Sequence, residues 1–106
     1  MPAEAQPQYL YLTTTGRRSR LPREIEIWFT EHDGRYYIIA EHGFAANWVQ
    51  NIVATPQVQV RVAARSFAAT ARVLEAGADA EKAKVNSTGK YGWGDGLVVE
   101  ITPVSE

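Results

Sequence analysis

A cluster of basic residues near the start of the chain carries the clearest chemical signal in the sequence. Positions 16–23 read Gly-Arg-Arg-Ser-Arg-Leu-Pro-Arg and hold four of the eleven basic residues. Guanidinium groups, a serine hydroxyl and backbone N–H groups left accessible by glycine suit phosphate or carboxylate oxygens, because charge-assisted bidentate hydrogen bonds are strong. The alternatives are a solvated basic turn and a nucleic-acid patch, although a patch needs basic residues spread along a face.

A second candidate site lies at positions 41–48, which read Glu-His-Gly-Phe-Ala-Ala-Asn-Trp. A strand end, a glycine and a helix start here offer unpaired N–H donors beside small side chains that an aromatic ring could approach closely. In the alternative interpretation Gly43 only turns the chain, Trp48 packs in the core and His42 is a surface residue. We interpret His32 as a residue of a hairpin turn without a chemical role.

A third candidate is the glycine-rich loop at positions 90–96, Lys-Tyr-Gly-Trp-Gly-Asp-Gly. Its two amphipathic aromatic side chains could cover a ligand and stack on it. The same loop could instead plug one end of the fold without touching a ligand.

Several kinds of catalytic site have no motif in this sequence. The chain has no cysteine, which excludes disulfides, thiolate chemistry and cysteine-built zinc or iron–sulfur sites. Gly-x-Ser-x-Gly, His-Glu-x-x-His and the phosphate-binding Gly-x-x-x-x-Gly-Lys-Ser/Thr pattern are all absent. We therefore expect no metal site and no catalytic side chain, and if the protein is an enzyme we expect a cofactor to carry the chemistry.

Most of the chain is predicted to form strands that position these segments. Alternating apolar residues, such as Ile25, Ile27 and Phe29, indicate half-buried strands, and Asp33-Gly34 predicts a hairpin between two of them. A helix of about two turns is expected from Asn47, as its cap, to the residue before Pro56, with Trp48, Ile52, Val49 and Val53 on one face. The expected strands are 9–15, 23–31, 36–40, 57–62, 67–74 and 97–102, and a second short helix is expected at about 78–84.

Six strands with short helices indicate a mainly β fold, a small closed or nearly closed antiparallel barrel. The 106 residues fit a single domain covering 1–106. A net charge of −1 argues against a nucleic-acid or anionic-lipid partner. Without a signal peptide or membrane span in the sequence, we expect a cytoplasmic protein, and the small core would gain stability from a dimer partner or a ligand.

Several motifs together resemble the deazaflavin-dependent nitroreductase family. They are Leu-Thr-Thr-Thr-Gly-Arg-Arg-Ser at 12–19, Pro-Arg at 22–23, Trp-Val-Gln-Asn at 48–51 and Thr-Pro-Gln-Val-Gln-Val at 55–60. The resemblance runs in order from about residue 9 to 75. It implies a six-stranded antiparallel split β-barrel, related to FMN-binding proteins, that forms a homodimer and binds coenzyme F-420.

The same resemblance implies an oxidoreductase that passes hydride from reduced coenzyme F-420 to a quinone, a nitro compound or another electron-poor acceptor. The alternatives are an FMN-binding protein of the same fold and a carrier module without catalysis. The residues implied for the phosphate and acidic tail are Arg17, Arg18, Ser19 and Arg23; those for the deazaflavin ring are Ala40, Glu41, His42, Asn47, Trp48 and Asn51, with Trp28 at the pocket wall; those for the acceptor are Trp28, Tyr91 and Trp93.

Overall fold

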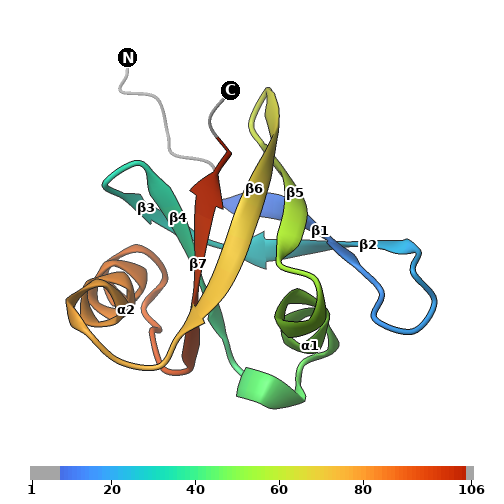
Figure 1. Ribbon diagram of the computed structural model, residues 1–106. Coiled ribbons are helices and arrows are strands. Elements are labelled where there is room, and N and C mark those ends of the chain that lie inside the picture. The colour runs from blue at the N-terminus through green and yellow to red at the C-terminus, as the bar shows by residue number, and fades with distance from the viewer. Residues whose placement is uncertain (1–7, 105–106) are drawn as a thin grey trace.

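The fold is one curled antiparallel sheet with two helices packed against it, in a computed structural model that describes residues 8–104 (Figure 1). The strand order across the sheet is β2-β1-β5-β6-β7-β4-β3. The strands are β1 (Tyr9–Thr15), β2 (Pro22–Trp28), β3 (Thr30–His32), β4 (Arg35–Ala40), β5 (Gln57–Val62), β6 (Arg65–Leu74) and β7 (Leu97–Pro103); the helices are the 3₁₀ turn η1 (Gly43–Ala45), α1 (Asn47–Ala54) and α2 (Ala78–Tyr91).

The expected mainly β antiparallel fold is confirmed, but the expected count of six strands is wrong. The predicted strand at 23–31 is two strands, since Phe29 and Thr30 are both buried and the alternation of buried and exposed residues breaks between them. β2 pairs with β1, and β3 pairs with β4. These two strands form opposite edges of the sheet although they are neighbours in the chain, so the sheet curls into an open barrel.

Residues at the end of α2 bind the backbone at the break between β2 and β3. The backbone N–H of Phe29 donates to the hydroxyl of Tyr91 at 3.1 Å, and the ammonium of Lys90 donates to the Phe29 carbonyl at 3.0 Å. A backbone group that leaves a β-ladder inside a protein needs such a partner. The helix therefore stabilises the point at which the chain crosses from one sheet edge to the other.

The main core fills the inside of the curled sheet and includes one face of α1. Val49 and Ile52 of α1 are buried, whereas Val53, which we expected on the same face, is 63% exposed. The buried face of the helix is centred near Trp48 and Ile52, and at 100° per residue Val53 lies too far around the axis to reach it.

The second helix is longer than the sequence indicated. It was expected at about 78–84 but spans Ala78–Tyr91. Ala80 and Ala83 in its first turns pack against Tyr37 and Val98 on the outer face of the sheet, and Lys90 and Tyr91 in its last turn bind the Phe29 carbonyl. These tertiary contacts stabilise a helix whose length would make it only marginally stable in isolation. The helix ends where Gly92 adopts φ 78°, so the expected loop at 90–96 begins only at that glycine.

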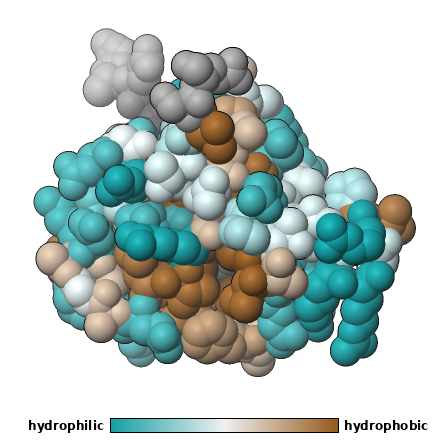
Figure 2. All heavy atoms as spheres, in the orientation of Figure 1, coloured by the Kyte–Doolittle hydropathy of each residue, from teal (hydrophilic) through white to brown (hydrophobic). Residues whose placement is uncertain are grey.

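The surface is hydrophilic over the β1–β2 turn, at the right of the view, while hydrophobic side chains gather at the lower centre of the view (Figure 2).

Between residues 8 and 104, neither helix has the length and apolar character needed to cross a membrane.

Candidate functional site

Two adjacent hollows share Trp48 as a common wall. Their volumes are about 550 and 530 Å³, within the roughly 300–1,000 Å³ typical of small-ligand sites. The first, here called the basic hollow, is lined by Thr14, Gly16, Arg17, Arg18, Ser19, Arg23, Ile25, Asn47, Trp48 and Asn51. The second, the aromatic hollow, is lined by Tyr9, Glu26, Ile27, Trp28, Phe29, Thr30, Tyr37, Ile39, Ala40, Glu41, His42, Ala46, Trp48, Ser87 and Trp93.

The β1–β2 turn forms the rim of the basic hollow. Gly16 donates its N–H to the Leu21 carbonyl at 2.8 Å and accepts from the N–H of Arg20 at 2.9 Å. A Cβ on Gly16 would lie 2.5 Å from the Ser19 hydroxyl oxygen and 3.3 Å from the Leu21 carbonyl oxygen, so a larger residue at this position would displace the Ser19 side chain. The Ser19 hydroxyl oxygen also accepts a hydrogen bond from the Leu21 N–H at 3.1 Å, which leaves the Ser19 O–H free to donate to a ligand.

Helix α1 fixes the base of the same hollow through Asn51. The buried amide oxygen of Asn51 accepts from the backbone N–H of Arg17 at 3.1 Å and from its guanidinium at 3.2 Å. The Asn51 amide group in turn donates to the Thr14 hydroxyl at 3.1 Å. Asn47 accepts from the Arg17 guanidinium at 3.4 Å; our expectation that Asn47 caps α1 is wrong, because the cap is Ala46 and no side chain bonds there.

Two arginines remain available for a ligand. Among residues 8–104, the guanidinium groups of Arg18 and Arg23 make no hydrogen bond or ion pair with the protein, although both line the hollow. Arg20 turns away to the Thr55 hydroxyl, at 3.4 Å. No carboxylate lines the basic hollow, so the field inside it is positive and favours an anion.

The wall of the aromatic hollow is stiffened by a ring stack. Trp28 lies parallel to Tyr91, with ring centroids 4.4 Å apart and an interplanar angle of 4°. Trp28 lines the hollow, whereas Tyr91 lies behind it, with its hydroxyl bonded to backbone at Phe29. Burial raises the pKa of the Tyr91 hydroxyl, so it remains a neutral hydrogen-bonding group. Two aromatic residues of the 90–96 segment were expected to contact the acceptor. The structure places Trp93 in the lining of the hollow and Tyr91 outside it.

The far end of β4 brings small and polar residues to the aromatic hollow. A Cβ on Gly96 would lie 2.6 Å from the Ala40 carbonyl oxygen, so glycine permits the close approach of the chain before β7. Glu41 and His42 follow at the mouth, where their side chains are about three-quarters exposed and lie 3.9 Å apart.

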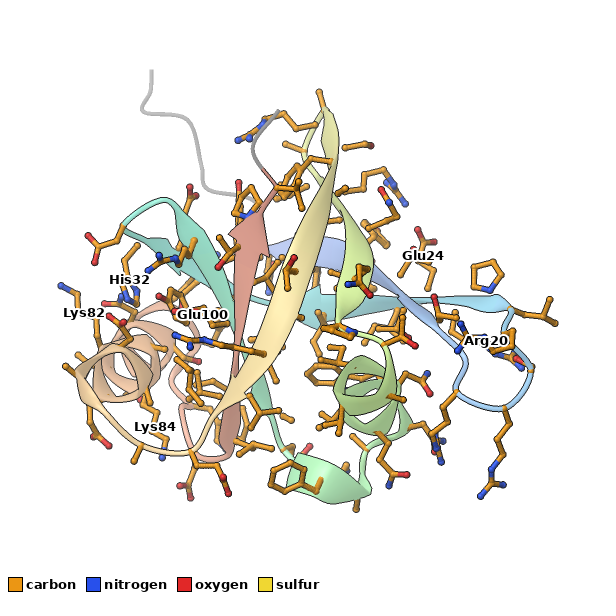
Figure 3. All side chains as sticks on the ribbon, in the orientation of Figure 1. Arg20, Glu24, His32, Lys82, Lys84 and Glu100 are labelled. Atoms are coloured by element: carbon orange, nitrogen blue, oxygen red, sulfur yellow. The ribbon has the colours of Figure 1, made fainter. Side chains whose placement is uncertain are left out.

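A buried polar network lies behind this hollow, on the outer face of the sheet. Glu100, on β7, is labelled in Figure 3. Tyr37 donates to its buried carboxylate at 3.0 Å, and Arg72 donates to its other oxygen at 2.9 Å. Burial, followed by this hydrogen bond to Glu100, raises the pKa of Tyr37 to about 12. The phenol is therefore neutral and holds its position in the lining as a donor.

The sequence reasoning missed part of both linings. Thr14 follows Leu10 and Leu12 on the inward face of β1, and Ile25 and Ile27 share one face of β2, so period-two alternation was a usable signal for these positions. The residues that reach the aromatic hollow by tertiary packing, Tyr37 and Ser87 among them, leave no local signal.

Most of the chain matches a known protein family. The family model described as F420H(2)-dependent quinone reductase matches residues 2–93 of the chain. The chain belongs to this family. The resemblance to a deazaflavin-dependent family, which the motifs indicated, is therefore confirmed.

Curated relatives are similar to part of the chain in sequence. The F420H(2)-dependent quinone reductase of Mycobacterium tuberculosis is 29% identical over 72 residues, which cover 65% of this chain and 48% of the relative. The chain thus spans about half the length of the curated relatives it matches.

Two solved structures show the same architecture. A structure described as an F420-H2 dependent reductase superposes with a TM-score of 0.73 at 23% identity, covering 95% of this chain and 98% of its own. The heme storage protein of Vibrio cholerae superposes with a TM-score of 0.76 at 16% identity, covering 94% and 84%. The expected split-barrel fold is confirmed, and because the ligands named for these proteins differ, the fold alone does not identify a ligand for this chain.

Proposed function

We propose that this family member binds coenzyme F-420 and transfers hydride from the reduced cofactor to a quinone or another electron-poor acceptor, such as a nitro compound. The observation that carries the proposal is the pair of hollows on either side of Trp48. One is positively charged and free of carboxylates, and the other is aromatic and mostly apolar. A phosphate-bearing cofactor with an extended ring system needs both environments side by side.

The basic hollow fits the phosphate and the acidic tail. Arg18 and Arg23 supply guanidinium groups that the protein does not use, and Ser19 supplies a hydroxyl donor. Arg17 contributes charge from a position held by Asn51. Arg17 and the Ser19 hydroxyl are held in place before the ligand arrives, which reduces the ordering cost of binding.

The aromatic hollow fits the deazaflavin ring. Ala40 and Ala46 present small side chains beside Trp48, which allow close approach to a planar ring. Asn47 contributes indirectly in this arrangement, since its oxygen faces Arg17. Glu41 and His42 lie at the mouth, where they would flank the exposed edge of the ring.

When bound in its reduced form, the deazaflavin supplies the hydride. The chain positions the two reactants: Trp28 and Trp93 line the remaining space for the acceptor, and Tyr91 keeps Trp28 in place from behind. Holding reactants in a fixed orientation is itself a large part of catalysis. No side chain is required as a nucleophile.

The proposal is tested by adding reduced coenzyme F-420 and a soluble quinone to the purified chain and following cofactor oxidation by absorbance. We expect protein-dependent oxidation with the quinone. Separate titrations with coenzyme F-420 and FMN address the alternatives: preferential FMN binding would replace the cofactor assignment, and binding of F-420 without any acceptor turnover would identify a carrier.

A homodimer is also proposed. Tyr9 and Trp28 are cross-strand partners on β1 and β2, and each is 39% exposed beside the aromatic hollow. A second copy of the chain would cover these two neighbouring aromatic side chains, and contiguous exposed apolar surface is typical of interaction sites. Light scattering after size-exclusion chromatography measures the mass directly, and a monomer at every concentration would contradict the proposal.

A further inference from the structure

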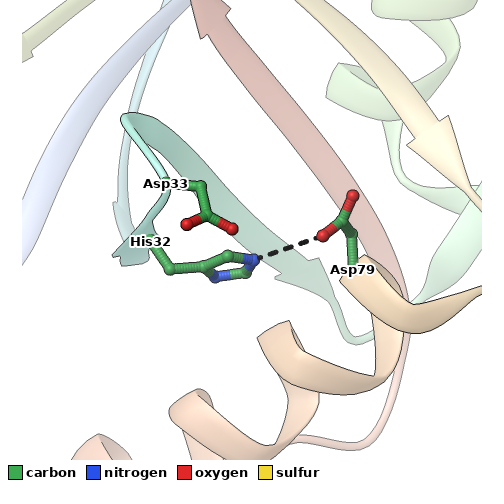
Figure 4. Close-up of side chains that lie close together, drawn as sticks. All are labelled: His32, Asp33 and Asp79. Atoms are coloured by element: carbon green, nitrogen blue, oxygen red, sulfur yellow. Dashed lines mark ion pairs between the residues drawn. The ribbon is translucent and has the colours of Figure 1, made fainter.

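Outside both hollows, three potential metal ligands converge where the β3–β4 turn meets α2. His32 is the last residue of β3, Asp33 follows it in the turn, and Asp79 lies in the first turn of α2 (Figure 4). One ligand atom from each residue lies within 4.8 Å of the other two. None of the three lines the basic or the aromatic hollow.

The imidazole of His32 is buried and held in one orientation. Its side chain is 9% exposed, and the ring stacks on Tyr37 with centroids 4.1 Å apart and an interplanar angle of 2°. Nδ1 lies 3.3 Å from the side-chain nitrogen of Asn86. The ring therefore has little freedom to turn toward water.

The other ring nitrogen has no hydrogen-bond partner. Within residues 8–104, Nε2 of His32 is a buried side-chain nitrogen without a bonded neighbour. It points toward Asp79, whose nearest oxygen is 3.8 Å away, too far for a hydrogen bond (Figure 4). Native proteins rarely leave a buried polar atom unsatisfied without a ligand or water.

We propose that Nε2 of His32 and the carboxylates of Asp33 and Asp79 bind a divalent transition-metal ion of the Zn²⁺ type, with water completing the coordination. Imidazole is a poor ligand for Mg²⁺ and Ca²⁺ and a good one for Zn²⁺, and two carboxylates balance the charge of the ion. Ligand atoms about 2.0–2.2 Å from Zn²⁺ must approach one another more closely than here. Asp33 and Asp79 are exposed and free to make that movement.

Asn86 completes the arrangement. Rotation of its amide by 180° places its oxygen against Nδ1 of His32, where it accepts the Nδ1–H and leaves the Nε2 lone pair for the metal. The helix dipole accounts for an acidic residue such as Asp79 in the first turn of α2, but it does not account for Asp33 or for the orientation of the imidazole.

The ion would stabilise the fold by linking two elements of the chain. It would join the β3–β4 turn to the start of α2, whose other end holds Phe29 through Lys90 and Tyr91. The sequence predicted neither a metal site nor a role for His32, because its ligands come from separate elements without a recognisable spacing.

The test uses the full chain after treatment with a chelator and dialysis. Zn²⁺ alone is titrated by calorimetry, and the Tm is measured with and without the ion. We expect micromolar binding and a rise in Tm. The variants His32→Gln and Asp79→Asn are expected to weaken Zn²⁺ binding about tenfold or more and to abolish the rise in Tm.

The controls are Glu81→Gln, which removes a different acid from the first turn of α2, and His42→Gln, which removes the other histidine. Both should bind Zn²⁺ as the parent does. If His32→Gln does not fold, Asp33→Asn serves instead, because asparagine tolerates the φ of 53° at this position. Three results would each overturn the proposal. They are no binding of Zn²⁺ at 100 µM, which is on the order of fifty times the expected Kd, binding by the ligand variants equal to that of the parent, and loss of binding in His42→Gln.

Discussion

Arg17 and Asn51, 34 positions apart, are joined at one atom: the amide oxygen of Asn51 accepts from the backbone N–H of Arg17 at 3.1 Å and from its guanidinium at 3.2 Å. This contact ties the β1–β2 turn to α1. It makes the shape of the basic hollow depend on a buried amide that need not itself touch the ligand.

Replacing that amide tests the dependence. Asn51→Leu leaves the Arg17 N–H and the Thr14 hydroxyl without their partner, and it should lower the free energy of unfolding by about 1–3 kcal/mol and weaken cofactor binding. Asn51→Asp keeps an acceptor for Arg17 but adds a negative charge beside the anion site, so it should weaken binding with a smaller loss of stability. Denaturant unfolding and cofactor titration on both variants check this, and normal binding by Asn51→Asp would contradict it.

The hydroxyl of Tyr91 is predicted to stabilise the crossing between the sheet edges. Tyr91→Phe keeps the ring that stacks on Trp28 but removes the acceptor for the Phe29 N–H. We expect a loss of about 1–2 kcal/mol in the free energy of unfolding, since a buried donor is left unpaired. A change below about 0.3 kcal/mol would indicate that water replaces the hydroxyl without cost.

Two glycines should respond to alanine in opposite directions. At Gly96 a Cβ would lie 2.6 Å from the Ala40 carbonyl oxygen, whereas at Gly89, inside α2, nothing lies within 4 Å. Gly96→Ala should destabilise the fold by about 1–3 kcal/mol and disturb the aromatic hollow, while Gly89→Ala should stabilise it by about 0.5–1 kcal/mol through helix propensity. Thermal unfolding of the pair measures both, and equal effects would show that the close approach at Gly96 is relieved elsewhere.

The raised pKa of Tyr37 predicts a loss of stability in alkali. Its pKa is about 12 in the folded protein against an ordinary value of 10.0. The folded state therefore keeps a proton that the unfolded state releases, and this contribution to stability is complete below pH 10 and is lost as the pH rises through 12. Unfolding measured across this range should show a smaller decline in Tyr37→Phe than in the parent; parallel declines would contradict the assignment.

The strands were predictable where burial alternates cleanly. β5 has the predicted bounds, since Val58, Val60 and Val62 are buried between exposed neighbours. The strand at 23–31 was not predictable as two strands, because the backbone of Phe29 at the break is bonded by Tyr91 and Lys90, more than 60 positions away. The full length of α2 likewise depends on its contacts with β4, β7 and Phe29 rather than on its own sequence alone.

The candidate site was likewise predictable only in part. The basic cluster was visible in the sequence because its members are consecutive, and the structure gathers them at one hollow. Which arginines stay available was not visible, since it depends on Asn51 and Thr55 taking Arg17 and Arg20. His32 gave no signal because Asp79 and Asn86, which face its ring nitrogens, lie on α2, more than 40 positions away.

The central claim is that Arg18 and Arg23 bind the phosphate of coenzyme F-420, and equilibrium titration of the cofactor fluorescence tests it most directly. Arg18→Ala and Arg23→Ala should each weaken binding by about 1.5–3 kcal/mol, or roughly 10- to 150-fold in Kd, while Lys82→Ala, which removes an exposed charge from α2, should bind as the parent does. Unchanged affinity in both arginine variants would contradict the account.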